Sequence, residues 1–125
     1  MRSLNKVELI GNVATDPMLP PENGKGPVLF KVATNRSWKV KEEIREEAEF
    51  HRIVAWDKVG ELAAKLLHKG DLVFVVGRIR TSKSKNKEGV EKEHFDIIVE
   101  DFIVLKRKEQ NGQPEKPTDT PKSGE

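Results

Sequence analysis

The sequence predicts an all-β fold: a five-stranded Greek-key barrel of the OB type, with one short helix between the third and fourth strands. Two observations predict it. Five stretches alternate apolar and polar residues with a period of two, as strands with one buried face do. Between the third and fourth of them, apolar residues recur at helical spacing. An SH3-like barrel has a similar number of strands, but the position of the helix favours the OB barrel.

The first two strands are predicted over residues 4–14 and 28–35. Gly11 in the first strand marks a bulge or a tight bend. Residues 18–27, rich in proline and glycine, are predicted to be a loop. The second strand is followed by a charge-dense connection, 36–47, in which acidic and basic residues cancel. Such a segment is typical of a solvated hairpin arm.

The third strand carries aromatic and basic side chains on one face. Its alternation places together Phe50, Arg52, Val54 and Trp56. Single-stranded nucleic acid exposes flat bases and a charged backbone, so a surface of rings and cations can bind it without reading its sequence. The alternative is that the three apolar residues form the core face of the strand. The arginine among them favours a binding face.

The central helix is predicted over residues 58–69, with Asp57 as its N-cap and Gly70 as the residue that ends it. The next stretch, residues 72–76, is apolar on both of its faces. A barrel hides only one face, so Leu72, Phe74 and Val76 indicate a contact with another subunit. Cover by the chain's own helix or loops is the alternative.

The last predicted elements are a Lys-rich hairpin tip, 82–90, and a fifth strand, 93–105, with a bulge near Asp101. Residues 78–92 hold six cationic and two acidic residues, a surplus of four, against +2 for the whole chain. Positive charge is therefore local, and the tip either is solvated or contacts phosphate. The predicted domain covers residues 1–107, and the polar, proline-containing tail, 108–125, is predicted to be disordered.

The sequence predicts no catalytic residue, no metal site and no cofactor, so we expect no enzyme. The chain has no cysteine, and its three histidines lie on separate elements without ligand spacing. Neither a transmembrane segment nor an apolar signal region is present in the sequence. A cytoplasmic, nucleoid-associated protein that does not bind membranes is expected.

Four blocks, in order and at matching spacing, resemble the bacterial-type single-stranded DNA-binding protein family. They are LNKVELIGNVATDP (4–17), ATNRSW (33–38), EFHRIVAWDKVGELAAKLLHKG (49–70) and GRIRT (77–81). The resemblance implies an OB-fold and a homotetramer built as a dimer of dimers. It also implies sequence-tolerant binding and protection of single-stranded DNA in replication, recombination and repair.

The resemblance further implies which residues contact DNA. Base stacking is expected from the aromatics Trp38, Phe50 and Trp56, although packing of the Trp38 ring back on the barrel is an open alternative. Contacts with the DNA backbone are expected from the matching cationic residues Arg52, Lys58, Lys69 and Arg80, and from Lys41 and Lys83 in variable loops. Besides the resemblance, the cations Arg36 and Arg78 are also expected to contact the backbone. His51 resembles a family histidine near the subunit contact, and a buried, hydrogen-bonded histidine explains it equally well.

Two departures from the family pattern matter. Ser84 stands near the point where the family often has a further stacking Trp, which indicates that one base platform is replaced by charge. The sequence ends Pro-Lys-Ser-Gly-Glu, without the acidic tip through which the family recruits replication and repair proteins. Two other functions stay open: an interaction module that resembles the primosomal OB proteins, and an RNA-binding OB domain.

Overall fold

The computed structural model describes residues 2–20 and 25–108 and shows a closed barrel with the strand order β1-β2-β3-β5-β4. The elements in chain order are β1 (Val7–Val13), β2 (Val28–Val40), β3 (Glu43–Ala55), α1 (Asp57–Leu66), β4 (Leu72–Lys85) and β5 (Glu91–Lys106). Five strands in a closed barrel, with one short helix between β3 and β4, confirm the predicted OB architecture. Apart from Lys108, the predicted tail lies outside the described residues.

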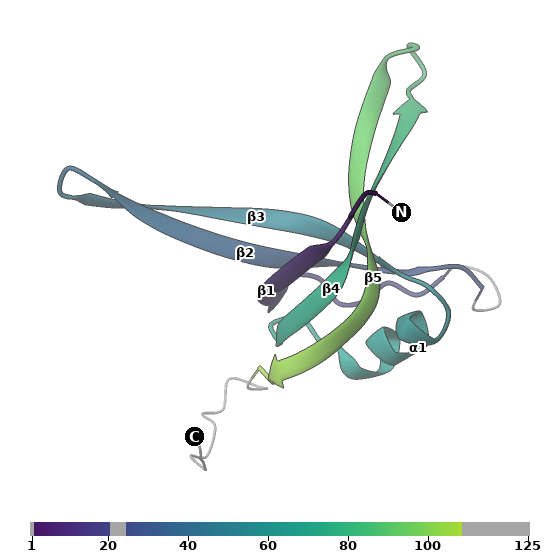
Figure 1. Ribbon diagram of the computed structural model, residues 1–125, viewed down its shortest axis with the longest axis horizontal. Coiled ribbons are helices and arrows are strands. Elements are labelled where there is room, and N and C mark those ends of the chain that lie inside the picture. Colours follow the sequence, from purple (N-terminus) through teal and green to yellow (C-terminus); the bar gives the residue numbers. More distant parts are fainter. Residues whose placement is uncertain (1, 21–24, 109–125) are drawn as a thin grey trace.

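Two long hairpins extend beyond the barrel as arms (Figure 1). The β2–β3 hairpin pairs from Val28 and Ala55 out to Val40 and Glu43, and β4 pairs with β5 out to Lys85 and Glu91. Between the hairpins, β3 and β5 pair in parallel over residues 52–54 and 96–98. The charge-dense segment 36–47 is therefore the solvated hairpin arm that its composition indicated. Most of this segment is strand, because its charged side chains stay solvated on both faces of an exposed two-stranded arm.

The core lies where the strands surround the barrel axis. Its centre is formed by fully or nearly fully buried side chains, among them Phe30, Val32, Ile53, Val73 and Val75. These residues alternate with outward ones along their strands, as the period of two predicted.

Phe95 is exposed, although the residues that share its face of β5 are buried. Ile97 and Val99, which alternate with it, are 8% and 4% exposed, whereas Phe95 is 62% exposed. The difference arises because β5 has already left β3 at residue 95 and runs along the β4–β5 arm.

Two glycines let strands approach closely. A Cβ on Gly11 would collide with the carbonyl oxygen of Ala33, and one on Gly77 would collide with that of Ile98. The pairing of β1 with β4 continues through Gly11 without a register shift, so this glycine marks a close approach rather than a bulge. The bulge predicted near Asp101 is confirmed, since Val76 pairs with Asp101 while Gly77 pairs with Val99.

The ends of α1 differ from the prediction. The N-cap is Trp56, without a side-chain cap, and Asp57 is the first helical residue, with φ of 56°. The helix ends at Leu66 rather than near Gly70, because the buried Leu67 is already extended and the amide of His68 donates to the Asp71 carboxylate at 3.0 Å. Burial of the Leu67 side chain therefore ends the helix before the chain reaches Gly70.

Asp71 joins three parts of the chain. It is the one buried polar or charged residue of the described chain, 1% exposed. Besides the His68 amide, its carboxylate accepts from the Lys108 amide at 3.1 Å and from Arg107 Nη1 at 3.0 Å. The buried charge is therefore compensated, and the end of α1, the start of β4 and the end of β5 are held together.

Replacing Asp71 should destabilise the fold more than replacing its partner. Asp71→Ala leaves two amides and a guanidinium without their acceptor, and we expect it to lower the free energy of unfolding by about 3 kcal/mol. Arg107→Ala should cost less, because Asp71 keeps both backbone donors. Urea denaturation at one protein concentration measures both, with the exposed helix variant Glu61→Ala as control. An Asp71→Ala loss no larger than that of the control would contradict this role.

Candidate nucleic-acid interface

The outward face of strands β3, β5 and β4 carries aromatic and cationic side chains. Arg52 pairs with Asp96 across β3 and β5, and Asp96 pairs with Arg80 across β5 and β4. Paired residues share a face of the sheet. Alternation along β3 adds Phe50 to this face, and Trp56, an extended residue directly after β3, continues the same alternation. We call this surface the binding face and define it by the outward residues Phe50, Arg52, Trp56, Arg78, Arg80, His94 and Asp96.

Two aromatic rings of the binding face are open to solvent. Phe50 is 61% exposed and Trp56 is 43% exposed. Val54 lies between the two rings along the chain and pairs with Ile98 of β5, and both side chains are buried, so the rings stand on a packed sheet. The two rings are therefore not core residues, and Val54 is buried on this outward face and does not belong to the core cluster.

The charges of the binding face are mostly positive. Arg52 Nε lies 3.1 Å from Asp96 Oδ1, with the Arg52 side chain 48% exposed and that of Asp96 only 16%. This contact lacks the geometry of a hydrogen bond, so Asp96 Oδ1 has no hydrogen-bond partner within the described chain. Arg78 and Arg80 are exposed and form no ion pair with any described residue, which leaves both guanidinium groups available for anions.

A notch opens where β3 and β5 diverge. Its volume is about 430 Å³, and its walls include Phe50 and Arg52 from β3, His94 and Asp96 from β5, and Ile79 from β4. Aromatic and apolar walls with a few polar groups suit a flat, partly polar ligand.

Trp38 lies apart from the binding face. It pairs with Arg45 on the β2–β3 arm, whereas Phe50 pairs with Ala33, so strand alternation places Trp38 and Phe50 on opposite faces of the arm. Trp38 is 37% exposed, and the Arg36 guanidinium carbon lies 4.5 Å from its ring centroid. Arg36 also pairs with Glu47 at 3.2 Å. The ring is thus held by a cation on the arm and is no part of the barrel core.

The other predicted cationic contacts are spread around the molecule. Lys41 forms the tip of the β2–β3 arm, and Lys83 pairs with Glu93 on the face of the β4–β5 arm opposite Arg80. Lys58 lies on α1, and the Lys69 amide donates to Asp16 Oδ1 at 2.8 Å. The structure brings together Arg52, Arg78 and Arg80, and it leaves these four lysines at the periphery.

An apolar patch covers a different part of the barrel exterior. The predicted interface residues Leu72, Phe74 and Val76 are half-buried on the outward face of β4. Phe74 pairs with Ile10 of β1 and Ile103 of β5, which are 59% and 54% exposed. We define the apolar patch as Ile10, Leu72, Phe74, Val76 and Ile103. Sequence reasoning missed Ile10 and Ile103, although Ile10 is an apolar residue on the outward face of its strand.

His51 does not belong to the apolar patch. Its side chain lines the notch, and its Nε2 lies 2.9 Å from Thr34 Oγ1 in a half-buried position. In the single chain, His51 is therefore a half-buried, hydrogen-bonded histidine, which is the second of the two interpretations that its sequence position allowed.

Sequence reasoning also missed His94 and Asp96. Alternation alone could have placed both on the face opposite Phe95 and Ile97. Their position beside Phe50 and Arg52 depends on the register of β5 against β3, for which the sequence holds no local signal.

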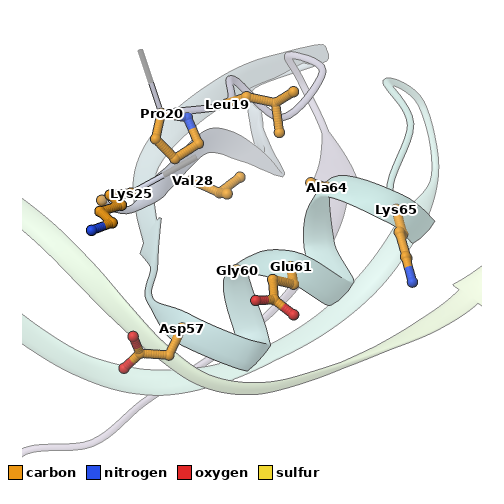
Figure 2. Close-up of a pocket in the computed structure, with 10 residues that line it drawn as sticks. Leu19, Pro20, Lys25, Val28, Asp57, Gly60, Glu61, Ala64 and Lys65 are labelled. Carbon is orange, nitrogen blue, oxygen red and sulfur yellow. The ribbon is translucent and has the colours of Figure 1, made fainter. Parts of the chain in front are cut away.

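A larger cavity of about 700 Å³ lies between α1 and the loop before β2. Figure 2 shows Asp57, Glu61 and Lys65 of the helix together with Leu19 and Lys25 of the loop. Acidic and basic side chains are mixed there, and none of the described residues that line it is aromatic, so these residues offer neither a platform nor a net charge. Within the described residues, no three His, Cys, Asp or Glu side chains are placed to hold a metal ion, and no helix is long and apolar enough to span a membrane.

Comparison with known proteins connects this geometry to a family. The model of the single-strand binding protein family matches residues 4–105. A single-stranded DNA-binding protein of Neisseria meningitidis serogroup A is 37% identical over 111 residues, which cover 87% of this chain. The chain spans 64% of that relative's length.

Two further similarities agree. Single-stranded DNA-binding protein 1 of Chlorobaculum tepidum is 37% identical over 114 residues, 89% of this chain and 70% of that protein. The solved structure of a Plasmodium falciparum SSB complex with ssDNA matches with a TM-score of 0.74 and 33% identity, over 84% of this chain and 97% of that one.

The exposure of the rings predicts how little they contribute to stability. Phe50→Ala should change the free energy of unfolding by less than about 1 kcal/mol, because its ring is already mostly exposed. Trp38→Ala should cost about 1 kcal/mol, because the contact with Arg36 is lost. Phe30→Ala, which empties a core position that is 3% exposed, should cost about 3–5 kcal/mol. Urea denaturation measures all three variants. A loss for Phe50→Ala as large as that for Phe30→Ala would return Phe50 to the core.

Proposed function

This chain belongs to the single-strand binding protein family, and on that basis we propose that it binds single-stranded DNA without reading its sequence. We further propose that it coats and protects the strand in replication, recombination and repair. One observation carries the proposal: the binding face places the exposed rings of Phe50 and Trp56 beside the guanidinium groups of Arg52, Arg78 and Arg80.

The proposed mechanism uses two kinds of contact. Bases stack on Phe50 and Trp56, each stack being worth about 1–3 kcal/mol, and phosphates contact the arginines. Every base has a flat face, so stacking tolerates any sequence. Asp96 holds Arg52 against the sheet and thereby limits the entropy that this side chain loses when DNA binds.

The arms extend this contact surface. Trp38 with Arg36, and Lys41 and Lys83 farther out, are proposed to meet the strand as it leaves the barrel. Lys58 and Lys69 are proposed to contact phosphates near α1. The function is binding alone, with no bond made or broken and no cofactor required, and its proposed location is the cytoplasm, at the nucleoid.

The proposal predicts a fluorescence response that depends on strandedness and salt. Oligo-dT should quench the Trp emission strongly, a duplex of equal length should not, and affinity should fall as salt rises. Arg52→Ala and Arg80→Ala should each reduce the slope of log affinity against log salt by about 0.7, the value for one phosphate contact on a single strand. The variant Leu62→Ala, exposed on α1, serves as control.

Two outcomes of this titration would contradict the proposal. Absence of quenching together with equal affinity for duplex would remove the stacking model and favour a protein-interaction module. Tighter binding of oligo-U than of oligo-dT would show an RNA-binding domain instead.

We also propose a homotetramer arranged as a dimer of dimers. The apolar patch exposes Ile10 and Ile103 in the single chain. In addition, β1 pairs with β2 only at Asn12 and Val13, so its earlier residues keep one edge unpaired among the described strands. A free strand edge and an apolar face are two separate contact surfaces, as a dimer of dimers requires.

A charge in the apolar patch should break this assembly. Phe74→Glu should reduce the mass measured by analytical ultracentrifugation to that of a dimer or a monomer, because burying an unpaired carboxylate between subunits is unfavourable. Ile44→Glu, a change at a 71% exposed site on the β2–β3 arm, should leave the mass unchanged. A monomeric wild-type protein, or a tetramer that tolerates Phe74→Glu, would contradict the proposed interface.

A further inference from the structure

Ser84 and His94 form a side-chain pair on the outward face of the β4–β5 arm. Ser84 Oγ and His94 Nε2 lie 2.9 Å apart. Ser84 pairs with Lys92 across the strands and Ser82 pairs with His94, so Ser84 and His94 are diagonal neighbours on one face. This is the face that carries Arg78 and Arg80 closer to the barrel.

Burial and a hydrogen bond restrict the orientation of the His94 ring. Its neighbours in the strand, Glu93 and Phe95, are exposed, whereas His94 is half-buried and lines the notch. The hydrogen bond to Ser84 fixes the ring from the other side. A ring that is already ordered loses little rotamer entropy when a ligand stacks on it.

The surroundings of His94 favour a nucleic-acid base as its contact. Phe50 lines the same notch from β3, and its volume of about 430 Å³ leaves room for one flat base. Arg80 and Lys92 lie on the same face and can hold the flanking phosphates. Glu93 and Phe95 also line the notch, from the other face of the arm. On that face Lys83 pairs with Glu93 and Lys85 with Glu91, so it carries no net charge, whereas the face of His94 carries the cations Arg80 and Lys92.

We propose that His94 is a further base-contacting residue of this protein and that Ser84 positions its ring. Together with Phe50 it forms a two-sided site for one base at the mouth of the notch. In this proposal Ser84 does not stack on a base. Its hydroxyl holds the His94 ring, on the neighbouring strand, in position to do so. This inference rests on the proposed binding of single-stranded DNA.

Substitutions at the pair, titrated with oligo-dT at several salt concentrations, test the proposal. His94→Ala should lower affinity about tenfold without changing the salt slope, because a stack is lost and no phosphate contact. His94→Phe, which keeps a flat ring, should stay within about twofold of wild type. Ser84→Ala should cause an intermediate loss of about threefold. The matched control is His68→Ala, whose side chain is 60% exposed and lies off the binding face.

Several results would overturn the proposal. If His94→Ala binds as tightly as wild type, the ring does not contact DNA. If His94→Phe is as weak as His94→Ala and both have a smaller salt slope, His94 contacts phosphate. If His94→Ala changes the mass in ultracentrifugation, the ring lies between subunits. Failure of the wild-type protein to bind oligo-dT would instead remove the proposed function itself, and circular dichroism of each variant shows that it is folded.

Discussion

The short parallel pairing of β3 with β5 is the constraint on which the rest of the structure depends. Three residues on each strand, 52–54 and 96–98, close the barrel, and both hairpins are far longer than this contact. The excess length has to leave the barrel, and it does so as two diverging arms (Figure 1). The same three pairs place Arg52 beside Asp96 and open the notch directly beyond them. The residue pairs that close the barrel are therefore the same pairs that assemble the binding face.

A single bulge divides the outside of the barrel into two surfaces. The register shift beside Gly77 gives β5 one extra residue, Glu100, so the outward positions change from even to odd numbers along that strand. Before the shift, Asp96 faces outward on the binding face. After it, Ile103 faces outward on the apolar patch while Phe102 packs against the core. Without this residue, polar and apolar side chains would exchange faces along half of the strand.

The binding face combines rigidity with chemical tolerance. Its rings stand on a packed sheet, one of its arginines is held by a carboxylate, and its histidine is held by a serine. Prearranged groups bind a flexible strand with a smaller entropic loss, and contacts to base faces and phosphates do not depend on base identity. In the proposed mode of binding, the solvated cations of the arms add contacts that weaken with salt, whereas base stacking does not weaken.

The sequence by itself determined the fold class, the outward face of β3 and the local concentration of positive charge. Each of these depends on neighbouring residues, through a period of two, a helical period or a run of like charges. The tertiary structure alone decided that His94 and Asp96 join Phe50 and Arg52, that Trp38 lies apart, and that α1 ends at Leu66. These outcomes depend on the register between strands far apart in the chain and on burial of side chains such as Leu67 and Asp71. Register and burial are set by packing in three dimensions, and no local pattern of residues encodes them.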